Sequence, residues 1–170
     1  MIWDAHSLFD AVMRRVITLP RLHEPKEMPI SLFIPCPDDA DAHDLDAAAL
    51  SSKQFEAFVY RNPHRMHFIK SWISQLLPPP PYVYDIAYLE RCPEIRSYPV
   101  LGDGFTICIS VHGVGTYCLN TRSFTWSRLV KWMLPFHGKV EYVPALKLWV
   151  GLSSANAQDM AVADLSSTDS

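Results

Sequence analysis

A leucine–proline pair recurs along this chain of 170 residues at a nearly constant spacing. The pairs are Leu19-Pro20, Leu77-Pro78 and Leu134-Pro135, separated by 58 and 57 residues. Proline cannot donate to the hydrogen-bond ladder of a sheet, so each pair is a natural stop for a strand. A constant period of this length is the sequence signature of a repeat protein.

The third repeat unit carries the clearest strand pattern. In residues 105–112 apolar and polar side chains alternate, which is the period of two that a half-buried strand requires. The turn at 113–115 contains two glycines, and residues 116–120 can return as the partner strand of a hairpin. With 97–101 in front and 124–134 behind, this unit is predicted to be a four-stranded antiparallel meander.

The neighbouring units repeat this pattern in part. Three strands are predicted after the meander, at 139–143, 146–150 and 160–165. Residues 29–34 and 55–60 also have strand character. The intervening residues 38–52 form a polar, acidic and alanine-rich loop of low β-propensity.

Two segments allow more than one interpretation. In residues 7–16 apolar side chains recur at spacings of one and four, with Ser7 and Asp10 in capping-box positions, so a short N-terminal helix competes with a strand. Residues 77–81 contain four consecutive prolines, which exclude a helix or an inner strand. They predict a polyproline II segment, either as a stiff connector or as a ligand for an SH3 or WW domain.

These patterns predict an all-β fold, a partial β-propeller built from four-stranded antiparallel meander repeats. One domain is expected over residues 1–166, with units at about 1–20, 27–78, 97–135 and 139–166, followed by a disordered tail at 167–170. A closed propeller typically has ~4 to 8 blades, and this chain supplies fewer strands than that. We therefore expect one of three outcomes: self-association that completes the blades, an open sheet array, or a decayed fragment of a longer propeller with no independent role.

Charge and hydropathy exclude several classes of partner. The 15 basic and 18 acidic residues give a net charge of -3, so no basic face is expected to bind nucleic acid. No apolar run approaches the roughly 18 residues of a membrane span, and the N-terminus has no signal-peptide pattern. A cytoplasmic or nuclear location follows as the expectation. In such a reducing compartment the four cysteines should be buried thiols, even though Cys108 and Cys118 could face each other across the predicted hairpin.

Several phrases of the sequence resemble one known family. They are 113–121, 125–127, 132–136 and 148–152, joined by 55–60 and 77–82. They are similar to phrases of a large, grass-expanded family of plant proteins, domain of unknown function 1668. The resemblance covers most of the chain outside the acidic loop and the tail, and it implies a plant protein with repeats in the style of kelch and F-box-associated propellers. No catalytic residue is assigned to that family, so none is carried over. The sequence departs from the family pattern at Asn120, where aspartate is frequent, and at 38–52, where an apolar strand is usual.

No metal or cofactor is expected from the sequence motifs. His64 and His67 share the spacing of helical metal ligands, but no cysteine or carboxylate stands close enough in sequence to complete a tetrahedral set. Residues 39–43 begin like a calcium loop and then lack both the turn-forming glycine and the bidentate glutamate. Residues 102–104 form a turn between strands, without the helix and Lys-Ser/Thr that a phosphate-binding loop needs.

Catalytic motifs are also missing from the sequence. There is no Gly-x-Ser-x-Gly elbow, and Ser110 and His112 stand two apart on one strand face, where a surface pair is more common than a triad. The alternative to a non-enzymatic protein is a small enzyme with its site on the sheet loops, using His112, Asp103 or Asp164.

We therefore predict a non-enzymatic module that binds another protein, whose identity the sequence does not indicate. Trp126 and Trp149 are expected in the core, since large aromatic side chains dominate packing between strands. The residues predicted to contact the partner lie in turns or beside Trp126: His112, Arg122, Arg128 and His137.

Overall fold

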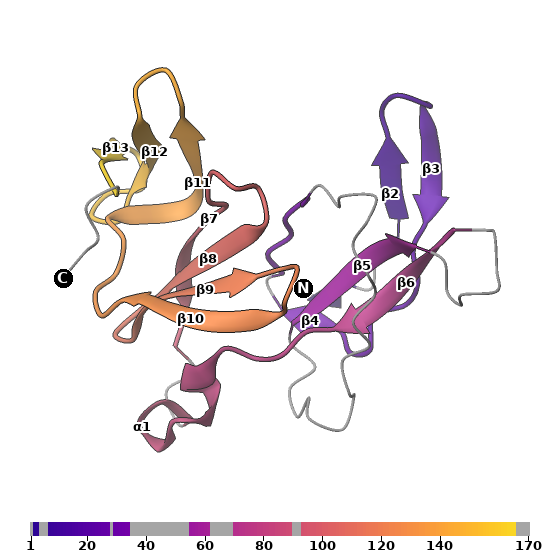
Figure 1. Cartoon of the computed structure of the whole chain (residues 1–170), viewed down its shortest axis with the longest axis horizontal. Coiled ribbons are helices and arrows are strands. Elements are labelled where there is room, and N and C mark those ends of the chain that lie inside the picture. Colours follow the sequence, from indigo (N-terminus) through magenta and orange to yellow (C-terminus); the bar gives the residue numbers. More distant parts are fainter. Residues whose placement is uncertain are drawn as a thin grey trace. The chain divides into compact units, whose positions relative to one another are not determined.

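The computed structural model describes residues 2–3, 7–27, 29–34, 55–61, 70–89 and 93–165. The chain divides into two compact units (Figure 1). The first unit consists of Met1–Phe33 and Asp44–Pro79, and the second of Ile34–His43 and Pro80–Ser170. Within the described ranges, no helix has the length and apolar character needed to cross a membrane.

The first unit contains three two-stranded antiparallel sheets. Strand β1 (Ile2–Trp3) pairs with β4 (Lys26–Glu27). Strand β2 (Ser7–Asp10) forms a hairpin with β3 (Arg15–Thr18), and β5 (Glu56–Arg61) pairs with β6 (Ser71–Leu76).

The second unit begins with two short helical turns, η2 (Pro81–Tyr84) and α1 (Ile86–Leu89), followed by one seven-stranded sheet. The strands are β7 (Ile95–Pro99), β8 (Thr106–Val111), β9 (Gly115–Asn120), β10 (Thr125–Val130), β11 (Phe136–Val143), β12 (Leu148–Ser153) and β13 (Met160–Ala163). Their order in the sheet is β10-β9-β8-β7-β11-β12-β13, and the sheet does not close on itself. The first helical turn contacts this sheet through Tyr82, whose ring centroid lies 5.6 Å from that of Tyr117. Burial raises the pKa of the Tyr82 hydroxyl, and the electrostatic effect of Tyr117 raises it further, to about 12.

The all-β prediction is confirmed, and so are both groups of strands in the second unit. The four-stranded meander forms in the order β10-β9-β8-β7, and the three later strands form β11-β12-β13. The sequence did not reveal that β11 pairs in parallel with β7, with Gly138 opposite Ser97, and so joins the two groups into one sheet. The grouping of the repeat units into a single domain stays a prediction.

A cluster of buried apolar side chains holds the second half of this sheet. Leu134, Phe136, Val140 and Trp149 form it, each with at most 7% of its surface exposed. Ala161 and Ala163 on β13 pack against the cluster. Trp149 is therefore a core residue, as predicted, whereas Trp126 on β10 is half-buried.

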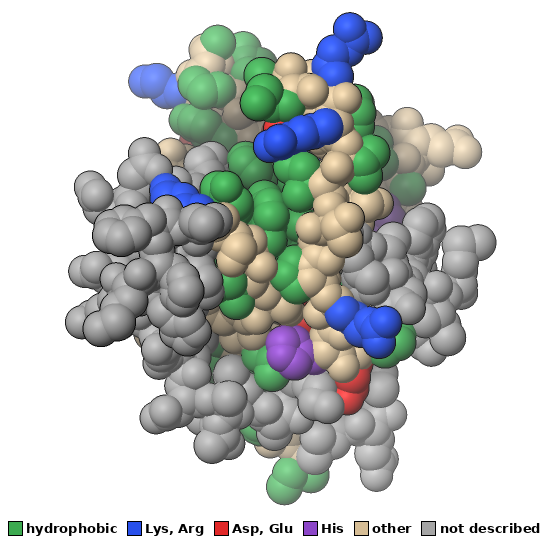
Figure 2. Space-filling model, turned by 90° about the vertical axis from the view of Figure 1, so that its right-hand side faces the viewer, with side chains coloured by type: hydrophobic (Ala, Val, Ile, Leu, Met, Phe, Trp, Pro, Cys, Tyr) green, Lys and Arg blue, Asp and Glu red, His purple; other side chains and the backbone are tan. Residues whose placement is uncertain are grey.

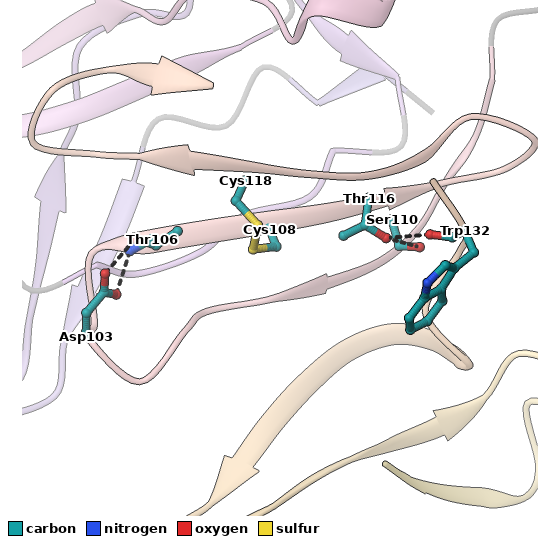
Figure 3. Close-up of a disulfide and its surroundings, with 7 residues drawn as sticks. All are labelled: Asp103, Thr106, Cys108, Ser110, Thr116, Cys118 and Trp132. Atoms are coloured by element: carbon teal, nitrogen blue, oxygen red, sulfur yellow. Dashed lines mark hydrogen bonds between the residues drawn. A yellow bond between two sulfur atoms is a disulfide. The ribbon is translucent and has the colours of Figure 1, made fainter. Parts of the chain in front are cut away.

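Two buried hydroxyl groups determine where β10 ends. The sequence pattern predicted strand character as far as residue 134, but β10 ends at Val130. The Thr116 hydroxyl donates to the Trp132 carbonyl over 3.0 Å (Figure 3). The Leu134 N–H donates to the Ser110 Oγ over 2.9 Å. These bonds satisfy the Trp132 carbonyl and the Leu134 N–H without a strand partner, so the chain can leave β10 and reach β11.

The expectation of free thiols is wrong for Cys108 and Cys118, which form a disulfide (Figure 3). The two residues are direct cross-strand partners of β8 and β9. The Thr121 N–H donates to the Phe105 carbonyl, and the alternation of an antiparallel ladder then makes 108 and 118 a non-hydrogen-bonded pair. Residues in such pairs approach most closely, and the two Cα atoms are 4.0 Å apart.

In the first unit the strand alternative for residues 7–16 is confirmed, and the strand predicted at 29–34 is wrong. The possible N-terminal helix is a hairpin, because the Asp10 carboxylate accepts the Val12 and Met13 N–H groups over 3.1 and 3.0 Å and closes a turn. Arg14 completes this turn with a φ of 51°. Residues 29–34 form no strand; Pro29 has no N–H to donate to a ladder.

The proline run behaves as a connector. Pro80 has a φ of -63° and a ψ of 147°, which are polyproline II values. Pro79 and Pro80 are buried, which leaves them unavailable as a ligand for an SH3 or WW domain. The acidic loop at 38–52, the His64 and His67 pair and the tail at 167–170 lie outside the described residues.

Candidate functional site

Three of the four predicted contact residues lie toward one end of the seven-stranded sheet. His112 is exposed in the turn between β8 and β9. The Arg128 guanidinium donates to the Val114 carbonyl of the same turn over 2.8 Å. His137 pairs with Leu152 and directly precedes Gly138, where the parallel pairing with β7 begins; at the start of β7, Ile95 lies opposite Val111.

Arg122 lies at the opposite end of the meander. It is in the turn between β9 and β10, where its guanidinium carbon is 3.7 Å from the centroid of the Phe105 ring. The six residues of β8 separate this end from His112, a distance of about 20 Å at ~3.3 Å per residue. The structure therefore does not bring Arg122 together with the other three residues.

The acidic residues considered for an enzyme site are also apart from His112. Asp103 lies at the Arg122 end, and its carboxylate accepts the N–H groups of Phe105 and Thr106 and the Thr106 hydroxyl. Burial raises the pKa of this carboxyl, but the hydrogen bonds from Thr106 and Phe105 outweigh it, so the pKa lies below the usual value. Asp164 follows β13. Ser110 is fully buried while His112 is exposed, so the two do not form a nucleophile and base pair.

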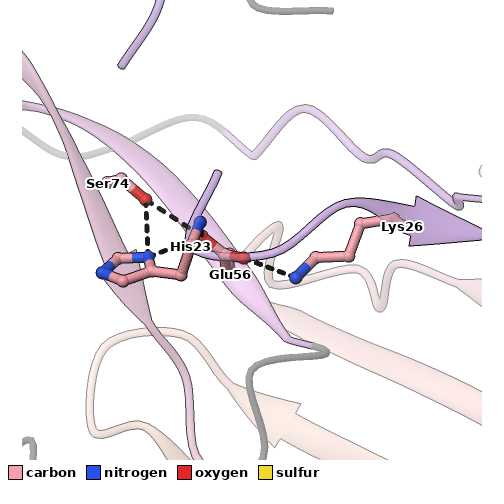
Figure 4. A network of polar contacts seen from close by, with 4 residues as sticks. All are labelled: His23, Lys26, Glu56 and Ser74. Atoms are coloured by element: carbon pink, nitrogen blue, oxygen red, sulfur yellow. Dashed lines mark hydrogen bonds and ion pairs between the residues drawn. The ribbon is translucent and has the colours of Figure 1, made fainter. Parts of the chain in front are cut away.

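The first unit contains a polar network that the sequence did not indicate. The side chain of Glu56, on β5, is only 2% exposed. Its carboxylate is paired with Lys26 and accepts the His23 N–H over 3.0 Å, the His23 ring Nδ1 over 2.8 Å and the Ser74 hydroxyl over 3.1 Å (Figure 4). The other residues of the network lie 18 to 33 positions from Glu56 in the sequence, so no sequence motif reveals the cluster.

This network has the composition of a catalytic triad but the wrong geometry. The Ser74 hydroxyl lies 3.4 Å from Nδ1 of His23, and Glu56 binds the same ring nitrogen. A relay requires the nucleophile and the carboxylate on the two different ring nitrogens. The network instead fixes the segment around His23 and Lys26 to the β5–β6 hairpin.

The Glu56 carboxylate makes the stability of the first unit dependent on pH. Burial raises its pKa, but the hydrogen bonds from Lys26 and His23 outweigh this and lower the pKa from 4.5 to about 2. A lowered folded-state pKa contributes stability above the unfolded value, and this contribution is lost as the pH falls from about 4.5 toward 2. We expect a loss of up to about 3 kcal/mol in the free energy of unfolding across this range, measured by urea unfolding. Glu56→Gln should remove most of this pH dependence, and an unchanged profile in that variant would contradict the assignment.

Four strongly exposed apolar side chains of the first unit gather on the β2–β3 hairpin. Phe9 is 63% exposed, Val12 90%, Met13 63% and Val16 69%. Phe9 and Val16 are direct cross-strand partners, so their side chains share one face of the hairpin, and Val12 and Met13 lie at its tip. Figure 2 shows hydrophobic side chains with Lys and Arg side chains beside them on this side of the molecule. We call these four residues the apolar hairpin.

An open groove of about 690 Å³ lies between the β2–β3 and β5–β6 hairpins. Its lining includes Arg15, Lys70 and the aromatic pair Tyr60 and Trp72, whose ring centroids are 5.3 Å apart. Val16 lines the same groove, so the groove and the apolar hairpin form one continuous surface. Nε of Arg15 lies 3.8 Å from Oδ2 of Asp10, and this ion pair holds the Arg15 guanidinium at the edge of the groove. Within the described ranges, no three His, Cys, Asp or Glu side chains are placed to hold a metal ion.

Fold and surface together define an all-β protein with an open, mostly antiparallel sheet and an exposed apolar hairpin. Comparison with known families then identifies the chain. It belongs to the family described as "Protein of unknown function (DUF1668)", whose family model matches residues 4–170. No curated protein and no solved structure matches the chain.

Proposed function

We propose that this protein is a non-enzymatic protein-binding module and that the apolar hairpin is its main contact surface. The observation that carries the proposal is the exposure of Phe9, Val12, Met13 and Val16 on one hairpin. Apolar side chains that gather on a surface commonly mark an interaction site, because covering them removes their area from water. Aromatic residues, methionine and arginine are also enriched in the buried centres of protein interfaces.

The charges beside the hairpin suggest the chemistry of the partner. Arg14 and Arg15 follow the apolar tip, and both are exposed. Lys70 and Arg15 line the adjoining groove. A partner with an apolar pocket and carboxylates on its rim would complement this surface. His112, Arg122, Arg128 and His137 remain proposed secondary contacts.

The family resemblance supplies the setting of the proposal. A plant protein with kelch-like propeller repeats is what the resemblance implies, and the four-stranded meander is in keeping with such a blade. Propellers present loops and hairpins around a rigid framework, which suits a binding role. A cytoplasmic or nuclear location is part of the same proposal.

A change in the apolar hairpin should abolish partner binding without unfolding the protein. Phe9→Thr keeps strand propensity, removes the aromatic anchor and leaves the fold unchanged, since Phe9 is 63% exposed. We expect at least ~30-fold weaker binding, the equivalent of about 2 kcal/mol for an interface hot spot. Affinity purification with quantitative mass spectrometry identifies the partner, and titration calorimetry with that partner measures the loss.

Leu146→Ser provides the matched control. Leu146 is 61% exposed in the turn between β11 and β12, so the substitution removes similar apolar area from another surface. Binding should be unchanged in this variant. Equal losses in both variants would contradict the assignment of the hairpin. Substrate turnover that His112→Ala abolishes would overturn the non-enzymatic proposal.

A further inference from the structure

Strand β13 forms one edge of the seven-stranded sheet. Among the described residues only β12 pairs with it. The Ser153 N–H donates to the Asp159 carbonyl over 2.8 Å, which sets the phase of the ladder between these two strands. Because hydrogen-bonded and non-hydrogen-bonded pairs alternate, Ala161 and Ala163 direct their backbone groups toward β12. Met160 and Val162 therefore direct their N–H and C=O groups to the open edge.

The four residues of β13 include no lysine and no proline, and they form no bulge with β12. Edge strands are commonly protected by lysine, proline or a bulge. The opposite edge strand, β10, has an irregularity between Arg128 and Val130 and carries the arginine itself. Strand β13 reads Met-Ala-Val-Ala and pairs with β12 in an unbroken register.

The side chains beside the edge are apolar and exposed. Met160 is 65% exposed and Val162 56%, and they share one face with Leu152, which is 40% exposed. Ala161 and Ala163 face the other way, toward the core cluster. The strand thus offers open backbone groups and an apolar strip together.

We propose that β13 pairs antiparallel with β13 of a second copy of this chain, about a twofold axis at Ala161. In this register Met160 lies opposite Val162 of the second copy, and each such pair exchanges both of its backbone hydrogen bonds. The apolar strip then continues across the axis, since cross-strand neighbours share a face. Asp164 lies opposite Gln158 of the second copy, so no two like charges face each other directly.

A second copy fits this edge better than an unrelated strand. A twofold interface must be self-complementary, and Met160 and Val162 are interchangeable apolar partners two residues apart. Shifting the register by two residues would place either Met160 opposite Asp164 or Val162 opposite Gln158, and in both cases this match is lost. The dimer closes on itself, because each chain contributes the same edge once.

Proline at the outward-facing position tests the backbone pairing. Val162→Pro removes an N–H that points to the open edge and leaves the β12–β13 ladder intact. Sedimentation velocity of residues 1–170 should show a concentration-dependent dimer that weakens at least about tenfold in Val162→Pro. Val162→Thr keeps the N–H and the branched side chain, and should dimerise like the unchanged chain. A monomer at every concentration, or a dimer unaffected by proline, would overturn the proposal.

Cysteine pairs test the register without depending on the proline variant. Ala161→Cys would face itself across the axis in a non-hydrogen-bonded pair, the same arrangement that joins Cys108 to Cys118. It should form a covalent dimer under mild oxidation. Ala163→Cys, on the same strand and face, lies opposite residue 159 of the second copy and should not. Crosslinking of both variants to equal extents would contradict the register. Phe9→Thr should dimerise normally, so a failure of this proposal and a failure of the proposed function are distinguishable.

Discussion

Replacing Phe136 by alanine is expected to lower the free energy of unfolding of the second unit by about 3–5 kcal/mol. Phe136 begins β11 and has no exposed surface. It packs with Leu134, Val140 and Trp149, the cluster that holds β11 and β12 together. Removing the ring loses its burial from water and leaves a cavity that the surrounding sheet cannot fill.

Gly151 shows how tightly this site is packed. A Cβ atom at Gly151 would lie 3.1 Å from Cδ1 of Phe136, so the ring occupies the space above the glycine on β12. The backbone on both sides is fixed by sheet pairing, which prevents collapse into the cavity.

Urea unfolding measures the effect, with tryptophan fluorescence and far-UV circular dichroism as probes. Phe9→Ala is the control, because the same ring is removed from a position that is 63% exposed. That variant should change stability by no more than about 0.5 kcal/mol. A loss below 1 kcal/mol in Phe136→Ala would show that the cluster is not the core of this unit.

Substituting Gly115 by alanine should destabilise the same unit by about 2–4 kcal/mol, through strain and overlap together. Gly115 opens β9 with a φ of +123°, a conformation that L-residues rarely adopt. A Cβ atom there would lie 2.7 Å from the Val130 carbonyl oxygen and 3.1 Å from the Lys131 carbonyl carbon.

The obstructing atoms belong to backbone that cannot easily move. Val130 pairs with Thr116, and the Thr116 hydroxyl holds the Trp132 carbonyl. The Leu134 N–H is held in turn by Ser110. Relief of the overlap would therefore disturb the exit from β10 and the approach to β11.

Gly102→Ala is the matched control. No atom lies within 4 Å of a Cβ placed at Gly102, and its φ is outside the left-handed region. Thermal unfolding of the two variants, followed by circular dichroism, should show a lower midpoint for Gly115→Ala alone. Equal midpoints would mean that the chain around Val130 adapts to the added methyl group.

The strand pattern of the second unit was readable because its signals are local. Alternating side chains and glycine-containing turns located β7 to β9 and the three strands that follow the meander, to within a few residues. The N-terminal hairpin was ambiguous because the segment is short, and the spacing of Leu8, Phe9 and Val16 fits both the helical period and the strand period. The Asp10 turn decides in favour of the hairpin. The Asp10 carboxylate accepts the N–H groups of Val12 and Met13, which in a helix would donate to backbone carbonyls four residues earlier.

The candidate surfaces were much less predictable than the strands. Arg122 and His112 both lie in turns, yet pairing places them at opposite ends of β8 and β9. The exposure of Phe9 and Val16 could not be foreseen, since a sequence pattern marks one face of a strand and not what covers it. The Glu56 network joins residues from three separate segments and leaves no motif.

By itself, the sequence determined an all-β fold, the order of its strands in the chain, and membership of one family, because side-chain alternation and turn chemistry act between near neighbours. Only the tertiary structure decided the parallel pairing of β7 with β11, the Cys108–Cys118 disulfide and the burial of Glu56. Each of these depends on the register or on contacts between distant segments. Register in turn is set by hydrogen-bond phase and packing of the whole sheet, which no local pattern encodes.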